Sequence, residues 1–171
     1  MKIKTSIVLK VAQRASCVIG YGLCFNLVFG QSENQQLTTA AWDAYRSNLF
    51  NVAISNAQAC IDSFEIQARD LQVELVRTNA PMPPTGRVST NVFDAIHANG
   101  LLNDVATCYF IIGESKKQLV AKKQATIREV KEAYERAQFF TYARCWDTND
   151  LFWSVPSTAN ARLRKLPPTP N

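Results

Sequence analysis

The segment FNVAISNAQACIDSFEIQARDLQVELVR, residues 50–77, carries the strongest structural pattern in the chain. Its apolar residues follow one another in alternating steps of four and three: Ala57, Ile61, Phe64, Ala68, Leu71 and Leu75. This spacing places side chains along one side of an α-helix, and the charged residues Asp62, Glu65 and Arg69 fall outside the stripe. The pattern predicts a long amphipathic helix from about residue 50 to residue 77.

Helical spacing also extends to both sides of this segment. A preceding helix starts near Leu37, with Thr38 or Thr39 as its cap, and breaks at residues 47–48. Three prolines in residues 81–84 end the long helix. Further helices are expected around 92–96, 102–116 (Asn103 near its start as a cap), 127–141 and 157–166, while 119–126 is either a turn or continued helix. An all-α fold of antiparallel helical hairpins follows, with about five to six helices in the mature chain.

The first thirty residues have the composition of a targeting segment. Four basic residues and no acid occupy positions 1–14, positions 15–29 are mostly apolar, and Gly30 precedes a polar stretch. This is the anatomy of a secretory signal peptide. The alternative is an uncleaved anchor, but the apolar run is shorter than the roughly 20 residues that span a bilayer. With no Asn-x-Ser/Thr acceptor, we expect an extracytoplasmic bacterial protein, periplasmic or secreted.

The charge of the chain gives no support for a nucleic-acid partner. The formal charge is +5, yet four of the 19 basic residues lie in this N-terminal segment and the remainder is close to neutral. The basic stretch 116–131 has no interleaved aromatic residues, so a solvated helical face is the favoured interpretation. We therefore expect no nucleic-acid partner, and contact with a membrane only through residues 1–30 if they stay attached.

The residues that carry chemistry are few. His97 is the single histidine, and no phosphate-binding loop, nucleophile motif or metal-ligand pattern occurs. The sequence predicts no catalytic residue, no metal and no cofactor. Three cysteines remain after cleavage, Cys60, Cys108 and Cys145. Two interpretations stay open: buried small apolar residues, which we favour, or a Cys60–Cys108 disulfide with one thiol left over.

The C-terminal part is unusually aromatic. Six aromatic residues lie within fifteen positions: Phe139, Phe140, Tyr142, Trp146, Phe152 and Trp153. One interpretation is an apolar plug that closes the open end of a helical array. The other is a groove for a sugar or a peptide, with Trp146, Asp147, Asp150 and Trp153 as a glycan site. A hydrolase would use Asp147 and Asp150 as its pair of carboxyl groups.

Two pairs of predicted helices resemble the tetratricopeptide repeat. The resemblance is carried in the first copy by Ala41, Tyr45, Phe50, Ala53 and Cys60, and in the second by Gly113, Tyr134 and Ala137. The second copy has about five extra residues before Val130, where the repeat usually has alanine. The chain also resembles small secreted bacterial tetratricopeptide-like proteins, some of which carry a β-glucanase label. The resemblance implies a repeat-like domain over 31–166, followed by a proline-rich tail, 167–171.

The resemblance implies an exported, non-enzymatic module for protein–protein interaction. A protein or peptide partner would bind across a concave helical face with five expected contact residues: Trp42, Tyr45, Asn48, Tyr109 and Lys116. The alternative function is a glycan-binding or glucanase-like protein that uses the C-terminal tryptophans and aspartates. A third is a structural envelope protein that assembles with itself.

Overall fold

A computed structural model describes residues 31–147, 149 and 151–168. The chain divides into two units after Gly30, and the fold below is that of the second unit. The expected signal peptide or anchor, 1–30, lies outside the described residues. Within them the order is α1 (Glu33–Arg46), α2 (Phe50–Arg77), α3 (Thr90–His97), α4 (Gly100–Val120), α5 (Ile127–Phe139), β1 (Arg144–Trp146), β2 (Phe152–Ser154) and α6 (Val155–Leu163). The mostly helical content confirms the all-α prediction.

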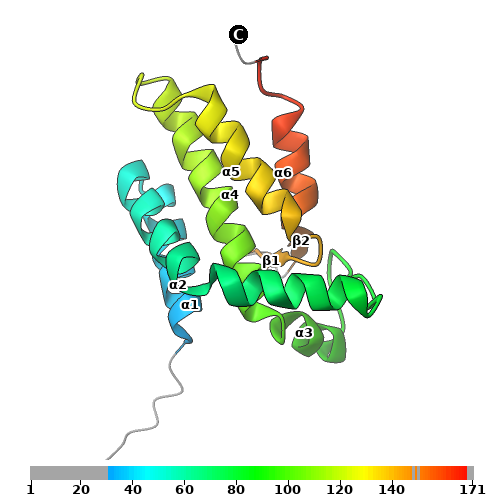
Figure 1. The fold of residues 1–171 in the computed structure, drawn as a ribbon. Coiled ribbons are helices and arrows are strands. Elements are labelled where there is room, and N and C mark those ends of the chain that lie inside the picture. The colour runs from blue at the N-terminus through cyan, green and yellow to red at the C-terminus, as the bar shows by residue number, and fades with distance from the viewer. Residues whose placement is uncertain (1–30, 148, 150, 169–171) are drawn as a thin grey trace, which may run out of the picture. The chain divides into compact units, whose positions relative to one another are not determined.

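Helix α4 is the centre of this unit. Figure 1 shows α1 and the first part of α2 on one side of it and α5 and α6 on the other, while the second part of α2 crosses its lower end. Its sequence is apolar nearly all round, and every residue of 105–108 and 110–115 is buried. A helix with this composition has to be covered on several sides. The amphipathic helices α1, α2, α5 and α6 provide that cover, and α1 packs on α2 as α5 packs on α4.

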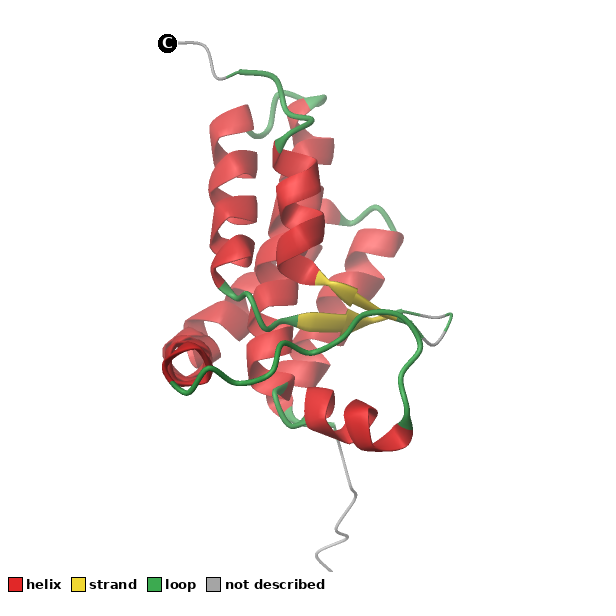
Figure 2. Cartoon of the chain, turned by 90° about the vertical axis from the view of Figure 1, so that its right-hand side faces the viewer, coloured by secondary structure: helices red, strands yellow, loops and turns green. Residues whose placement is uncertain are grey.

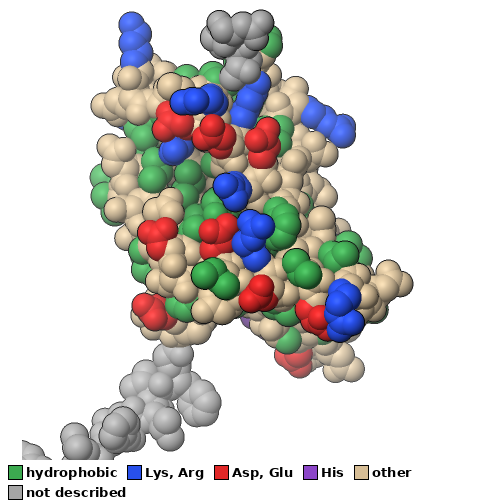
Figure 3. Space-filling view, in the orientation of Figure 1, with side chains coloured by type: hydrophobic (Ala, Val, Ile, Leu, Met, Phe, Trp, Pro, Cys, Tyr) green, Lys and Arg blue, Asp and Glu red, His purple; other side chains and the backbone are tan. Residues whose placement is uncertain are grey.

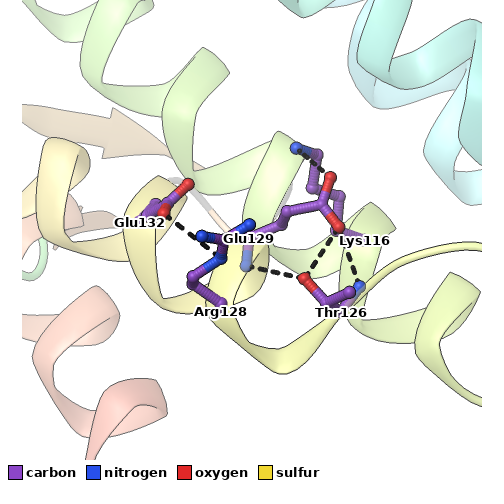
Figure 4. Close-up of polar contacts among 5 residues, drawn as sticks. All are labelled: Lys116, Thr126, Arg128, Glu129 and Glu132. Atoms are coloured by element: carbon purple, nitrogen blue, oxygen red, sulfur yellow. Dashed lines mark hydrogen bonds and ion pairs between the residues drawn. The ribbon is translucent and has the colours of Figure 1, made fainter. Parts of the chain in front are cut away.

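The predicted helix limits are mostly close to the observed ones. The long helix α2 has the expected bounds, and the open question at 119–126 is answered by a turn before α5. Figure 4 shows how α5 starts: Thr126 Oγ1 accepts from the Glu129 amide, and the Glu129 carboxylate accepts from the Thr126 amide. This reciprocal pair is a capping box. Ser154 caps α6, because its Oγ accepts from the Ser157 amide at 3.3 Å.

Two expected caps are wrong. Helix α1 begins at Glu33, four residues before Leu37, so that Thr38 lies inside it and donates to the Asn34 carbonyl at 2.9 Å. Asn103 lies in the first turn of α4, whose N-cap is Asn99. The side-chain Nδ2 of Asn103 donates to the Ile96 carbonyl, and its Oδ1 accepts from the backbone amide of Arg144. Asn103 therefore joins α3 and β1 to α4.

The hairpin of β1 and β2 was not predicted. The strands pair antiparallel over three residues each, and Gly86 of the proline-rich segment adds a bridge to Phe152 (Figure 2). Gly86 has φ of +88°, a conformation that favours glycine. The buried Arg144 side chain donates to the carbonyls of Pro83 and Pro84, so the hairpin and the proline segment hold each other in place.

The described residues contain no helix with the length and apolarity needed to span a bilayer. The Leu166 amide donates to the Leu163 carbonyl, and residues 167–168 of the proline-rich tail are exposed and lack regular structure. The rest of the tail lies outside the described residues.

Helices α4 and α5 approach each other closely where Gly113 meets Tyr134. A β-carbon placed on Gly113 would lie 2.6 Å from Cε1 and 2.7 Å from Cδ1 of Tyr134. The Tyr134 ring is fully buried, and its hydroxyl donates to Glu114 Oε1 at 2.8 Å. The ring is thus enclosed on its sides and tied at its tip. Glycine at 113 is required for this approach.

We expect Gly113→Ala to destabilise the protein by about 2 kcal/mol, because the overpacking cost exceeds the gain in helix propensity. Urea unfolding followed by circular dichroism measures the change. Gly100→Ala is the matched control, since a β-carbon at Gly100 meets nothing within 4 Å. Equal stability of the two variants would contradict the packing argument.

Candidate functional site

The three tryptophans of the chain line one cavity, which we name the tryptophan groove. Its volume is about 430 Å³. It lies between α1 and the β1–β2 hairpin and is lined by Thr39, Trp42, Arg46, Cys145, Trp146, Asp147 and Trp153. The groove brings together residues that are about a hundred positions apart in the sequence.

Each tryptophan of the groove is supported by another aromatic ring. Phe110, which is buried in α4, lies 6.4 Å from Trp42 and 5.2 Å from Trp153 between ring centroids. The rings of Trp146 and Phe93 lie perpendicular to each other, with 6.4 Å between their centroids, and Trp146 is 50% exposed. No ring contact joins two of these tryptophans to each other in the described structure. They stand apart around the groove, with space between them.

A second, smaller cavity adjoins the groove along Trp42 and Trp146. We name it the polar pocket; its volume is about 250 Å³. Besides the shared tryptophans it is lined by residues with hydrogen-bonding side chains, among them Asn34, Gln35, His97, Asp104 and Arg144. Donors and acceptors therefore lie directly beside the aromatic groove.

Burial shifts the pKa of two ionisable groups in the polar pocket, Asp104 and Arg144. Loss of solvent raises the pKa of the Asp104 carboxyl to about 6, and the hydrogen bond from Asn34 Nδ2, at 2.6 Å, opposes the rise. Burial also lowers the pKa of Arg144, whose guanidinium donates to backbone carbonyls. A carboxyl with a raised pKa in a cavity is a frequent feature of binding and catalytic sites.

The five residues expected to bind a protein partner do not gather at one place. Trp42 lines the groove, and Tyr45 touches Trp42 at 5.8 Å while its hydroxyl points to Glu114 Oε2 at 3.5 Å. Asn48 forms the α1–α2 turn with φ of +59° and lines a different cavity. Tyr109 stacks on Phe140. Figure 4 shows Lys116 reaching Glu129 across α4 and α5, at 3.3 Å.

The residues of the alternative glycan site lie closer together. Trp146, Asp147 and Trp153 all line the tryptophan groove, and Asp150 lies outside the described residues. Asp147 Oδ1 accepts from the amides of Asn149 at 2.8 Å and Leu151 at 3.1 Å, so this carboxylate shapes the loop of the hairpin. The aromatic cluster fits each interpretation in part. Phe140, Tyr142 and Phe152 are buried, as an apolar plug requires, whereas Trp146 is half exposed, as a groove requires.

Sequence reasoning missed the polar pocket. Asn34, Gln35, Asp104 and Arg144 were not among the expected site residues. One signal was available: Asp104 is an acid inside the apolar stretch of α4, a position where a charge has to have a partner or a function. His97 lies at the pocket with its ring 4.2 Å from Phe93. Within the described part of the chain no group of three or more His, Cys, Asp or Glu side chains is arranged to hold a metal ion.

Comparisons with protein-family models, with curated proteins and with solved structures find no match to this chain.

The titration of Asp104 predicts a pH-dependent stability. The pKa of this carboxyl rises from 3.8 to about 6 on folding, so the folded state binds the proton more tightly than the unfolded chain. Stability therefore decreases as the pH rises from about 4 to about 6, and the ionised carboxylate costs up to about 3 kcal/mol above that range. Asp104→Asn removes this cost. We expect the variant to be more stable than the wild type at pH 7.5 and to lose this advantage at pH 4.

Thermal unfolding at several pH values measures both proteins. Asp70→Asn, an exposed aspartate on α2, is the control and should leave the pH profile unchanged. A stability difference for Asp104→Asn that is the same at pH 4 and pH 7.5 would show that this carboxyl is not responsible.

Proposed function

We propose that residues 31–166 form an exported, non-enzymatic binding module and that its ligand is a carbohydrate held in the tryptophan groove and the polar pocket. The observation that carries this proposal is the convergence of all three tryptophans on one cavity. A tetratricopeptide-like arrangement is part of the proposal. It is supported by the pairing of α1 with α2 and of α4 with α5, and by the close Gly113–Tyr134 contact.

The chemistry of the two cavities suits a sugar. The C–H groups of a pyranose ring stack on an indole face, while its hydroxyl groups need donors and acceptors in fixed positions. Trp146 offers a half-exposed indole anchored by Phe93, so little side-chain freedom is lost on binding. Asn34, Gln35 and His97 stand beside it with amide and imidazole groups. Aromatic surface and polar groups are thus adjacent within one site.

Binding is favoured over hydrolysis by what the carboxylates already do. Glycosidases need two carboxyl groups about 5–10 Å apart that are available to the substrate. Among the described lining residues the carboxylates are Asp104 and Asp147. Asp104 accepts the amide of Asn34, and Asp147 holds the hairpin loop through two backbone amides. Both side chains are engaged with the protein itself, which supports a role in shaping the site.

Intrinsic tryptophan fluorescence tests the proposal directly, because every tryptophan of the chain lies at the groove. The probes are a soluble β-1,3-glucan and chitohexaose, titrated into the full chain. We expect a saturable shift in emission with at least one probe. Trp146→Ala should weaken binding about tenfold, which corresponds to roughly 1.4 kcal/mol, without loss of stability, since this side chain is half exposed.

Phe139→Ala is the matched control. Phe139 belongs to the same aromatic cluster and is 38% exposed, but it packs against Arg69 of α2 and does not line the groove. Its loss should leave affinity unchanged. No emission change with either probe, or equal weakening by both variants, would overturn the proposal. Release of reducing ends that stops in Asp104→Asn would show a hydrolase in place of a binding module.

A protein partner remains the second candidate, favoured by a different observation. The outer face of α2 exposes Ile66 (75%), Val73 (57%) and Val76 (58%), which are spaced by seven and three. Figure 3 shows apolar side chains interspersed with acidic and basic ones on this part of the surface. Apolar side chains exposed along one helix face are typical of interaction surfaces.

The second candidate predicts a partner that depends on α2. The full chain, tagged at its C-terminus, is purified from the source organism. A protein that co-purifies with the wild type and with Trp146→Ala, but not with Ile66→Glu, would favour it. A partner that is lost with Trp146→Ala and kept with Ile66→Glu would place protein binding at the groove.

A further inference from the structure

Two thiols from different helices meet in the core beneath the polar pocket. Cys60 of α2 and Cys108 of α4 are both fully buried and are free thiols in the structure. Their sulfur atoms lie 3.7 Å and 3.3 Å from the same atom, Oγ1 of Thr38 in α1. Cys60 further donates to the Asn34 carbonyl at 3.8 Å.

We propose that Cys60 and Cys108 are a modification site: they form a disulfide that joins α2 to α4 when the chain folds under oxidising conditions. A sulfur–sulfur bond is about 2.05 Å long and needs two side chains that already face each other. The shared contact with Thr38 Oγ1 brings the sulfur atoms of α2 and α4 to the same point of the core. The proposal does not depend on the carbohydrate site.

The oxidant is a disulfide compound, such as glutathione disulfide or a protein disulfide donor. The Cys60 thiolate attacks one sulfur of the oxidant and displaces the first thiolate, which leaves a mixed disulfide on Cys60. The Cys108 thiolate then attacks the Cys60 sulfur and displaces the second. Cys60 and Cys108 together lose two electrons and two protons, and the oxidant is reduced to two thiols.

The environment of the pair supports this order of attack. The neighbouring Cys108 thiol lowers the pKa of Cys60, while the same interaction and burial raise the pKa of Cys108. The thiolate is the nucleophile in disulfide exchange, so Cys60 attacks first once α2 and α4 have paired and Cys108 lies beside it. Because the folded structure leaves neither sulfur exposed, exchange belongs to the folding chain, before α1 covers the pair with Asn34 and Thr38.

Cys145 is the built-in control. It lies on β1, and its thiol donates to the Trp146 carbonyl at 3.6 Å. Burial raises the pKa of its thiol to about 12, so it stays protonated and unreactive in the folded protein. We expect it to remain a thiol when the other two are oxidised.

The test is oxidative refolding of the full chain. Reduced, denatured protein is refolded in a buffer of reduced and oxidised glutathione, remaining thiols are alkylated in denaturant, and tryptic peptides are identified by mass spectrometry. Trypsin separates the three cysteines, because cleavage sites such as Arg69, Arg87 and Arg144 lie between them. We expect a Cys60–Cys108 cross-linked peptide and an alkylated Cys145. We also expect the melting temperature to be roughly 10 °C higher than that of the reduced protein, because the link restricts the unfolded chain.

Three variants keep the outcome interpretable. Cys145→Ser should form the same cross-link with the same rise in melting temperature. Cys60→Ser and Cys108→Ser should each lose both. If either of these two variants fails to fold, the proposal is still tested by comparing oxidised with reduced protein, both for the wild type and for Cys145→Ser. A full set of alkylated thiols after oxidative refolding, or a cross-link from Cys145 to either partner, would overturn the proposal.

Discussion

The carboxylate of Glu114 lies where four helices meet. It is 7% exposed and accepts a hydrogen bond from Tyr134 of α5 at 2.8 Å, one from Arg162 of α6 at 2.6 Å, and a longer one from Tyr45 of α1 at 3.5 Å. Burying a carboxylate is costly unless donors replace the lost water. Each of these helices brings one donor to α4, so the charge is satisfied only when α1, α5 and α6 are all in place.

The groove follows from this arrangement. Phe110, one turn before Glu114 on α4, supports Trp42 from α1 and Trp153 from β2. Arg162 holds α6 on Glu114, and β2 runs directly into α6, so the position of the hairpin is tied to the same charge. On the other side, Arg144 fastens the hairpin to the proline-rich segment. The aromatic residues of the groove are therefore carried by a rigid core, which favours binding without large rearrangement.

The polar pocket and the thiol pair share two residues of α1. Asn34 donates to Asp104 through its side chain and accepts from Cys60 through its carbonyl, while Thr38 lines the pocket and contacts both thiols. The start of α1 is thus a wall of the pocket and the cover of the proposed disulfide. A link between Cys60 and Cys108 would hold α2 and α4 together beneath the turn of α1 that carries Asn34. We therefore expect oxidation of the thiol pair and ligand binding in the polar pocket to influence each other through this turn.

The sequence by itself determined the class of fold and most helix limits. Apolar spacing in α2 and the prolines after it are local signals, which act through neighbours along the chain. The structure was needed to show the turn at 119–126, which the sequence analysis left open, and the Thr126–Glu129 capping box that follows it. The tertiary structure alone decided the hairpin, whose strands are too short to show an alternating pattern, and the role of Asn103, which has partners in α3 and β1. The tertiary structure also decided which residues come together at the candidate site. Trp146, Asp147 and Trp153 stood out as an aromatic and acidic cluster, but Trp42, Asn34 and Asp104 join them only through packing around α4. Contacts across a hundred residues depend on how helices cross, and no local pattern encodes that.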